Sequence, residues 1–214
     1  MRTNDGVYGG AFADGALPID VDLIDRVEII RGPGSSLYGT GAFSGVINII
    51  PKRGRDVNGV ELAAEYGSWD SERGRVSAGK KTESGLDGLV SVSAFKTRGT
   101  PSVVFPELAG DATRNYGVVE NNQALRWRNI YTALEYKDFR LEYAEAARRN
   151  HLSTGLYGAV FNAPNINSDS TQLLNLEFNH AFNSNDSVFA RLGYHYYDYY
   201  SDSLYDYPPP TLTH

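Results

Sequence analysis

The strongest constraint on the fold of this chain is a series of alternating segments that begins near residue 59. Within each segment, apolar and polar residues alternate, as they do in a β-strand whose two faces meet different surroundings. We count about seven segments, each near the ten-residue length that a tilted membrane-crossing strand needs. The clearest are 60–66, 129–136, 139–143, 174–179 and 188–195, and the stretches 72–80 and 87–97 are extended with less regular alternation.

The connections between these segments alternate in length. The short ones are 81–87, 137–138 and 183–186, and the long ones are about 98–127, 148–171 and everything after 200. Short turns at one end of a sheet and long loops at the other are typical of the wall of an outer-membrane barrel.

A soluble antiparallel meander alternates apolar and polar residues in the same way. A soluble β-rich ligand- or carbohydrate-binding module is therefore the alternative. The two differ in what Leu174, Leu176 and Phe178 should face. A barrel turns them to lipid, whereas a soluble module buries them against a second sheet.

Aromatic residues gather near the ends of the expected strands. The set comprises Tyr66, Trp69, Phe95, Trp127, Tyr136 and Phe182. Tyr and Trp favour the membrane–water boundary, because the ring is apolar and its polar tip stays hydrated. The tyrosines between 194 and 200 fit such a girdle or a contact surface equally well.

Composition excludes several other classes of protein. The net charge is -6 with no basic run, which argues against a nucleic-acid partner. The chain has no cysteine, and its four histidines lack metal-ligand spacing. No catalytic constellation is evident, so we expect no enzyme activity, no cofactor and no metal site.

Residues 1–54 differ from the rest and read as a small mixed unit. A helical turn is expected within 21–25, a short strand at 26–30, and a turn with one helical turn at 31–39. A second strand is expected at 45–50, and Pro51 closes it.

The stretch 17–54, LPIDVDLIDRVEIIRGPGSSLYGTGAFSGVINIIPKRG, resembles the C-terminal part of the plug domain of TonB-dependent receptors. The residues that carry the resemblance are 23–33, 36–39 and 45–50, and they are typical of the iron-complex or vitamin branch. Gly41 and Pro51 depart from the family pattern without touching the core of the motif. The resemblance implies an incomplete fragment, with part of an α+β plug at 1–54 and the N-terminal part of the barrel at 55–214. The implied fold is mainly all-β, a partial antiparallel transmembrane barrel with about seven of about 22 strands.

The resemblance also assigns roles to particular residues. Arg26, Glu28 and Arg31, which we expect to point to one side of their strand, would hold the plug against the barrel wall. Tyr8 and Phe12 would contact the ligand. The residues that would shape the plug motif are Gly32, Pro33, Gly34, Leu37, Tyr38, Gly39, Gly45 and Asn48.

The function implied is energy-coupled uptake of a bulky, scarce solute across the outer membrane of a Gram-negative bacterium. An iron–siderophore complex is favoured, with cobalamin, haem or a saccharide as alternatives. The implied partners are the TonB complex, reached through an N-terminal segment missing here, the ligand and outer-membrane lipid. No nucleic acid is expected.

Overall fold

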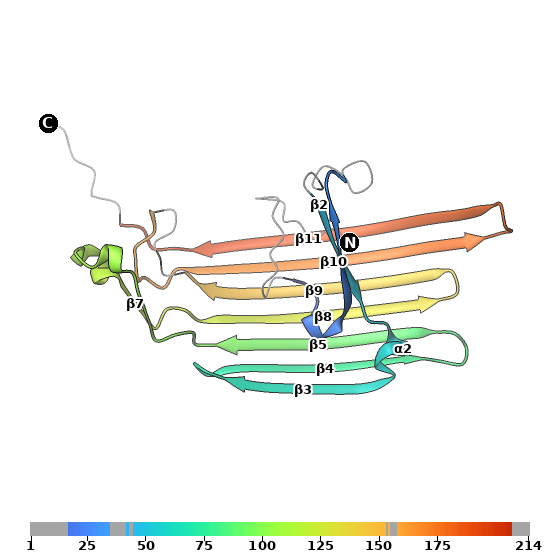
Figure 1. The fold of residues 1–214 in the computed structure, drawn as a ribbon, viewed down its shortest axis with the longest axis horizontal. Coiled ribbons are helices and arrows are strands. Elements are labelled where there is room, and N and C mark those ends of the chain that lie inside the picture. The colour runs from blue at the N-terminus through green and yellow to red at the C-terminus, as the bar shows by residue number, and fades with distance from the viewer. Residues whose placement is uncertain (1–16, 35–41, 43–44, 153, 155–157, 207–214) are drawn as a thin grey trace.

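The dominant element of the computed structural model is one antiparallel sheet of seven strands (Figure 1). Residues 17–34, 42, 45–152, 154 and 158–206 are described. The strands are β3 (Gly59–Gly67), β4 (Ser71–Lys81), β5 (Asp87–Thr97), β8 (Leu125–Tyr136), β9 (Phe139–His151), β10 (Ile166–Ala181) and β11 (Ser187–Asp202). Each strand pairs with its neighbour in sequence within the sheet, in the order β11-β10-β9-β8-β5-β4-β3. The expected segments and their up-and-down connection are confirmed.

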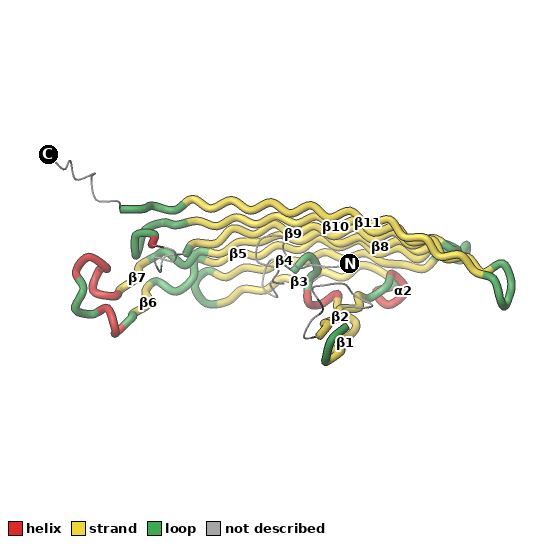
Figure 2. The backbone as a smooth tube through the Cα atoms, turned by 90° about the horizontal axis from the view of Figure 1, so that it is seen from above, coloured by secondary structure: helices red, strands yellow, loops and turns green. Residues whose placement is uncertain are grey.

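The N-terminal unit precedes this sheet and lies across one of its faces (Figures 1 and 2). It consists of a 3-10 helix, η1 (Val21–Leu23), and a hairpin of β1 (Ile24–Arg31) and β2 (Gly45–Pro51). Both strands were expected. The expected helical turn is shorter than predicted, because the chain becomes extended at Ile24.

The long connections gather at one end of the sheet (Figure 1). The connection between β5 and β8 contains a small two-stranded sheet and two 3-10 turns. These are β6 (Ser102–Val104), η2 (Pro106–Leu108), η3 (Ala112–Gly117) and β7 (Val118–Glu120). The connection expected at 148–171 is shorter than predicted, because β9 continues to His151 and β10 begins at Ile166.

The two faces of the sheet are inverted relative to those of a water-soluble protein. Leu62, Val76 and Val92 are cross-strand neighbours on one face and are at least half exposed. On the opposite face, Ser77 and Ser91 are at most 3% exposed. A polar inner face with an apolar outer face is the arrangement of a wall that meets hydrocarbon.

A soluble module was expected to bury Leu174, Leu176 and Phe178 against a second sheet, and the described part of the structure does not show this. Leu174 and Leu176 are each 37% exposed, and they share the outward face with Phe178. The N-terminal unit packs on the opposite face, against Tyr131 and Leu173. No helix in the described ranges is long and apolar enough to cross a membrane.

The aromatic girdle is only partly as expected. Tyr136 and Phe139 face outward as direct neighbours at the end with short turns. Phe95 and Trp127 do not, because their register places them on the inward face with Arg73. Their rings stack there at a centroid distance of 5.7 Å.

An apolar cluster seats the N-terminal unit on the inward face of the sheet. Leu23 and Ile19 contribute from its side, and Leu89, Tyr131 and Leu173 contribute from the sheet. Leu23 is completely buried. Burial of a Leu side chain is worth about 1.5–3 kcal/mol, so this cluster fixes where η1 meets the wall.

A short helix, α2 (Gly54–Val57), joins the hairpin to β3 and packs against β4 and β5. Its first residue needs to be glycine, because a Cβ on Gly54 would collide with the backbone carbonyl of Gly88. The expected boundary between residues 54 and 55 falls at the start of this helix.

The inverted sheet predicts a depth-dependent cost for a charge on its outward face. Leu176→Arg places a guanidinium within the apolar band and should destabilise the folded protein in lipid by about 2–4 kcal/mol. Val188→Arg is the control, because Val188 is equally exposed at the turn end of the sheet; its cost should be about 0–1 kcal/mol. Urea titration of the complete protein in liposomes measures both free energies of unfolding, and equal costs would contradict the prediction.

Candidate functional site

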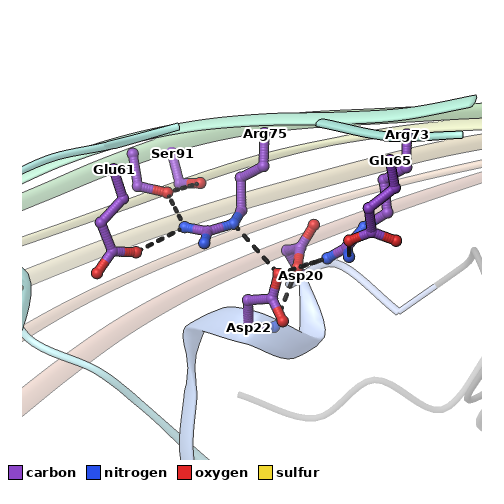
Figure 3. Close-up of polar contacts among 8 residues, drawn as sticks. Asp20, Asp22, Glu61, Glu65, Arg73, Arg75 and Ser91 are labelled. Atoms are coloured by element: carbon purple, nitrogen blue, oxygen red, sulfur yellow. Dashed lines mark hydrogen bonds and ion pairs between the residues drawn. The ribbon is translucent and has the colours of Figure 1, made fainter. Parts of the chain in front are cut away.

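The candidate site is the polar contact between η1 and the inward face of the sheet (Figure 3). Asp20 is the N-cap of η1 and accepts a hydrogen bond from the backbone N–H of Asp22 at 3.0 Å. A side-chain acceptor at this position stabilises the first helical turn. The sequence Pro-Ile-Asp-Val-Asp-Leu therefore presents two carboxylates next to Leu23, the residue that anchors the turn.

Two arginines of β4 reach these carboxylates from the wall. The Arg73 guanidinium donates to Asp20, and to Asp22 at 2.9 Å. Nε of Arg75 lies 3.5 Å from an oxygen of Asp22. Arg73 and Arg75 are two residues apart on one strand, so both point to the same face. The contact thus joins segments about fifty residues apart in sequence.

Each of these arginines also has a carboxylate on the wall itself. Arg73 pairs with Glu65, and Arg75 donates to Glu61 at 3.0 Å. Arg75 donates further to the Ser77 hydroxyl at 2.6 Å. The arginines therefore keep counter-charges when the N-terminal unit moves away, which lowers the cost of separating the two surfaces.

Burial makes this contact sensitive to the loss of one partner. The side chain of Asp20 is 2% exposed, that of Arg75 is 7% and that of Arg73 is 15%. Loss of Arg73 would leave the buried Asp20 carboxylate without its ion-pair partner and cost about 3–5 kcal/mol, whereas loss of the Asp20 charge leaves Arg73 paired with Asp22 and Glu65. The second oxygen of Asp20 has no hydrogen-bond partner among the described residues, so the pair is held without full hydrogen bonding.

A second polar contact lies where the N-terminal unit continues into the sheet. The backbone N–H of Arg55 donates to the buried Asp87 carboxylate at 3.0 Å, and its guanidinium pairs with the same group. Hydrogen bonding to Asp87 raises the pKa of Arg55. Arg53 lies 3.4 Å from Glu135. The hairpin is therefore fixed to the wall at α2 as well as at η1.

The charged residues expected to hold the unit to the wall bond mainly within the hairpin. Arg26 pairs with Glu28 at 3.0 Å, and Asn48 donates to Glu28 at 3.1 Å. The bond from Arg26 lowers the pKa of Glu28. Arg31 lies on the other side of the strand, because it is an odd number of residues from Glu28 in a regular register. The expectation that all three share one side is therefore wrong for Arg31.

Arg26 nevertheless faces the wall across a cavity of about 460 Å³. The charged wall residues that line this cavity are Arg140, Glu142, Glu177 and Arg191. The described residues give Arg26 no ion pair with the wall. Its role in plug–barrel contact, and those of Glu28 and Arg31, remain predictions.

The expected plug-motif residues are partly described. Gly32 has φ +100°, which favours glycine, and a Cβ on Gly45 would lie 2.7 Å from the carbonyl oxygen of Ile30. The N–H of Gly34, which follows Pro33, donates to the carbonyl of Ala42 at 2.9 Å. Leu37, Tyr38, Gly39, Tyr8 and Phe12 lie outside the described residues. No cluster of three metal-ligating side chains occurs within the described ranges.

Sequence reasoning missed the residues that make the contact. The acidic pair Asp20 and Asp22 stands directly before the recognised motif, which was the available signal. Arg73 and Arg75 are arginines at alternate positions of an expected transmembrane strand. Such a strand faces hydrocarbon on one side, so they had to point inward, and inward charges need partners.

The comparisons with known proteins agree with this geometry. Residues 2–46 match the family model described as TonB-dependent Receptor Plug Domain. The metal-pseudopaline receptor CntO of Pseudomonas aeruginosa is 25% identical over 83% of the chain and 25% of its own length. The vitamin B12 transporter BtuB of Vibrio cholerae is 37% identical over 35% of the chain and 13% of its length.

Among solved structures, a mutant of the ferric enterobactin receptor PfeA of Pseudomonas aeruginosa, in complex with enterobactin, superposes with a TM-score of 0.50 and 21% identity. The match covers 81% of this chain and 28% of that one. The family model and these relatives together support a fragment of a TonB-dependent receptor. The chain spans about a quarter of the length of the relatives that it matches over most of its residues.

The buried contact predicts an asymmetry between two carboxylates of the plug. Asp20→Asn keeps the oxygen that caps η1 but removes the charge that faces Arg73. We expect the plug of the complete receptor to unfold or leave the wall about 1.5–3 kcal/mol more easily, the worth of a hydrogen bond to a charged group, because Arg73 keeps Asp22 and Glu65. Limited proteolysis of the plug across a urea series measures this change.

Asp25→Asn is the matched control, because Asp25 is half exposed and, among the described residues, forms an ion pair with Arg26 alone, in its own strand. Its effect should fall within about 0–1 kcal/mol. Equal protection of the plug in the two variants would contradict the role given to Asp20.

Proposed function

We propose that the complete protein is an outer-membrane receptor that imports a bulky solute with energy supplied through TonB. The observation that carries the proposal is a plug segment bound by buried ion pairs to the polar face of a membrane-type sheet. A plug held in this way closes the inside of the wall. It can leave without stranding the wall arginines, because Glu61 and Glu65 remain beside them.

Uptake in this mechanism has three steps. First, the solute binds on the loop side. Second, the plug shifts. Third, Arg73 and Arg75 lose the plug carboxylates Asp20 and Asp22 and keep the wall carboxylates Glu65 and Glu61. Work delivered through TonB supplies the several kcal/mol needed to separate the buried ion pair between plug and wall. The segment that would contact TonB is not part of the described structure.

For the solute we favour a metal–chelator complex, with an iron–siderophore first. Support comes from the metal-pseudopaline receptor CntO, which matches most of the chain. A corrinoid such as vitamin B12 is the second candidate, because BtuB matches a shorter stretch at higher identity.

Inward aromatic residues near the loops offer a surface for such a solute. Phe95 and Trp127 stack on each other on the inward face, close to the loop end of β5 and β8. Flat, apolar and partly exposed rings suit the aromatic or macrocyclic groups of these solutes. Arg148, on the adjoining strand in the same row, is neutralised by its ion pair with the buried Asp169.

Uptake by a deletion strain, with and without the complete gene, tests the function under iron limitation. Radiolabelled ferric siderophores of the catecholate, hydroxamate and mixed classes are compared with labelled cobalamin. We expect loss of one ferric complex in the deletion strain and its return on complementation. Unchanged uptake of every iron complex would remove the iron assignment, and selective loss of cobalamin would establish the second candidate.

Trp127→Ala tests the aromatic surface in the same assay. A lost stacking partner is worth about 0.5–1.5 kcal/mol, so the apparent affinity for the imported solute should fall about two- to tenfold. Tyr136→Ala is the control, because Tyr136 faces outward at the other end of β8. An equal fall in both variants would place the ligand elsewhere.

A further inference from the structure

Four cations crowd the outward face of the sheet at its loop end. Lys96 of β5 is directly opposite Arg126 of β8, and Arg126 is directly opposite Arg149 of β9. Arg128 lies two residues further along β8, on the same face. Together these residues form a basic patch across three adjoining strands.

The alternation of side chains shows that the patch faces away from the plug. Arg73 and Arg75 point inward to Asp20 and Asp22, so their strand neighbours Glu72 and Val76 point outward. Glu72 pairs with Lys96, which shares its face. The patch therefore lies on the same surface as the apolar residues Val76 and Val92, beyond them toward the loops.

Positive charge in the patch is not balanced by neighbouring residues. Lys96 pairs with Glu72 at 3.0 Å and Arg128 with Glu145 at 3.4 Å. Arg126 and Arg149 have no ion-pair partner in the described part of the chain, although they face each other directly. Like charges at directly opposite positions of two strands are destabilising. An external anion would relieve this repulsion.

The surface between these side chains is hollowed. A cavity of about 790 Å³ is lined by the small residues Gly74, Ala94 and Ala147, together with Arg126 and Arg149. The small residues leave room beneath the long cationic side chains. A guanidinium matches phosphate with two parallel hydrogen bonds, which makes a pair of arginines around a hollow suited to a phosphate group.

We propose that this basic patch binds the phosphate of a lipid headgroup in the leaflet that surrounds the loop end of the barrel. The proposal rests on the membrane location given under the proposed function. The location of the patch favours a lipid over a soluble anion. The patch borders the apolar band on the outward surface, where acyl chains would pack below a bound headgroup. In the outer leaflet of a Gram-negative outer membrane, the phosphorylated glycolipid lipid A carries such a group.

The test uses the complete receptor in detergent, titrated with bisphosphorylated lipid A and with lipid A stripped of phosphate. For the double variant R126Q/R149Q we expect roughly 30-fold weaker binding of the phosphorylated lipid, from two lost contacts of a charge with an anionic surface. The control K80Q/K137Q removes two cations at the opposite end of the sheet and should bind like the parent. The charge-retaining variant R126K/R149K should keep most of the binding.

Three results would overturn the proposal. They are equal losses in R126Q/R149Q and K80Q/K137Q, equal binding of phosphate-free lipid A by the parent, and displacement of the lipid by millimolar inorganic phosphate. Membrane fractionation and uptake are measured on the same strains. Absence of the receptor from the outer membrane would refute the proposed function, whereas a receptor that is present and active but binds lipid without Arg126 and Arg149 would refute this inference alone.

Discussion

The structure depends on one constraint: a sheet in hydrocarbon must turn its apolar side chains outward and gather its polar ones on the inside. At the depth of the apolar band, polar residues such as Arg75, Ser77 and Ser91 therefore lie on the inner face. Desolvated charges there require partners. The plug supplies part of that compensation through Asp20 and Asp22, so the nature of the wall determines the chemistry of the segment that fills it.

The ion pairs between plug and wall are shared between two surfaces. A contact made only of plug carboxylates and wall arginines would leave two buried cations behind on separation. Glu61 and Glu65 change this balance, because they hold the arginines in both situations. The apolar cluster around Leu23 has no equivalent substitute and resists separation with its full burial energy. Apolar packing therefore fixes the position of the plug, and the wall carboxylates lower the cost of breaking its ion pairs with the wall.

Much of the fold could be predicted from the sequence, because strand alternation is a local signal. The seven strands of the large sheet, their order and the short turns between them follow from period-two patterning and turn residues, whereas β6 and β7 lie in a stretch that was expected to be loop. The hairpin followed from the plug motif. The candidate site was predicted less well. Arg26 and Glu28 were expected to contact the wall, but they are close in sequence and form an ion pair with each other. The pairing of Asp20 with Arg73 depends on where the hairpin lies over the sheet, which local patterns do not encode. Phe95 and Trp127 were misplaced because residue type near a strand end does not determine which face it occupies.

Strand length has a consequence for the end of the wall that lies opposite the long loops. β3 has nine residues, whereas β10 and β11 have sixteen each. At about 3.4 Å per residue and a tilt near 40°, sixteen residues rise about 40 Å, against an apolar band of about 25 Å. The register places that surplus at the end with short turns, where β10 continues beyond its last partner in β9, Phe139, to Ala181. A molecule that has passed the plug would therefore leave beside a rigid rim of paired backbone on this side of the wall.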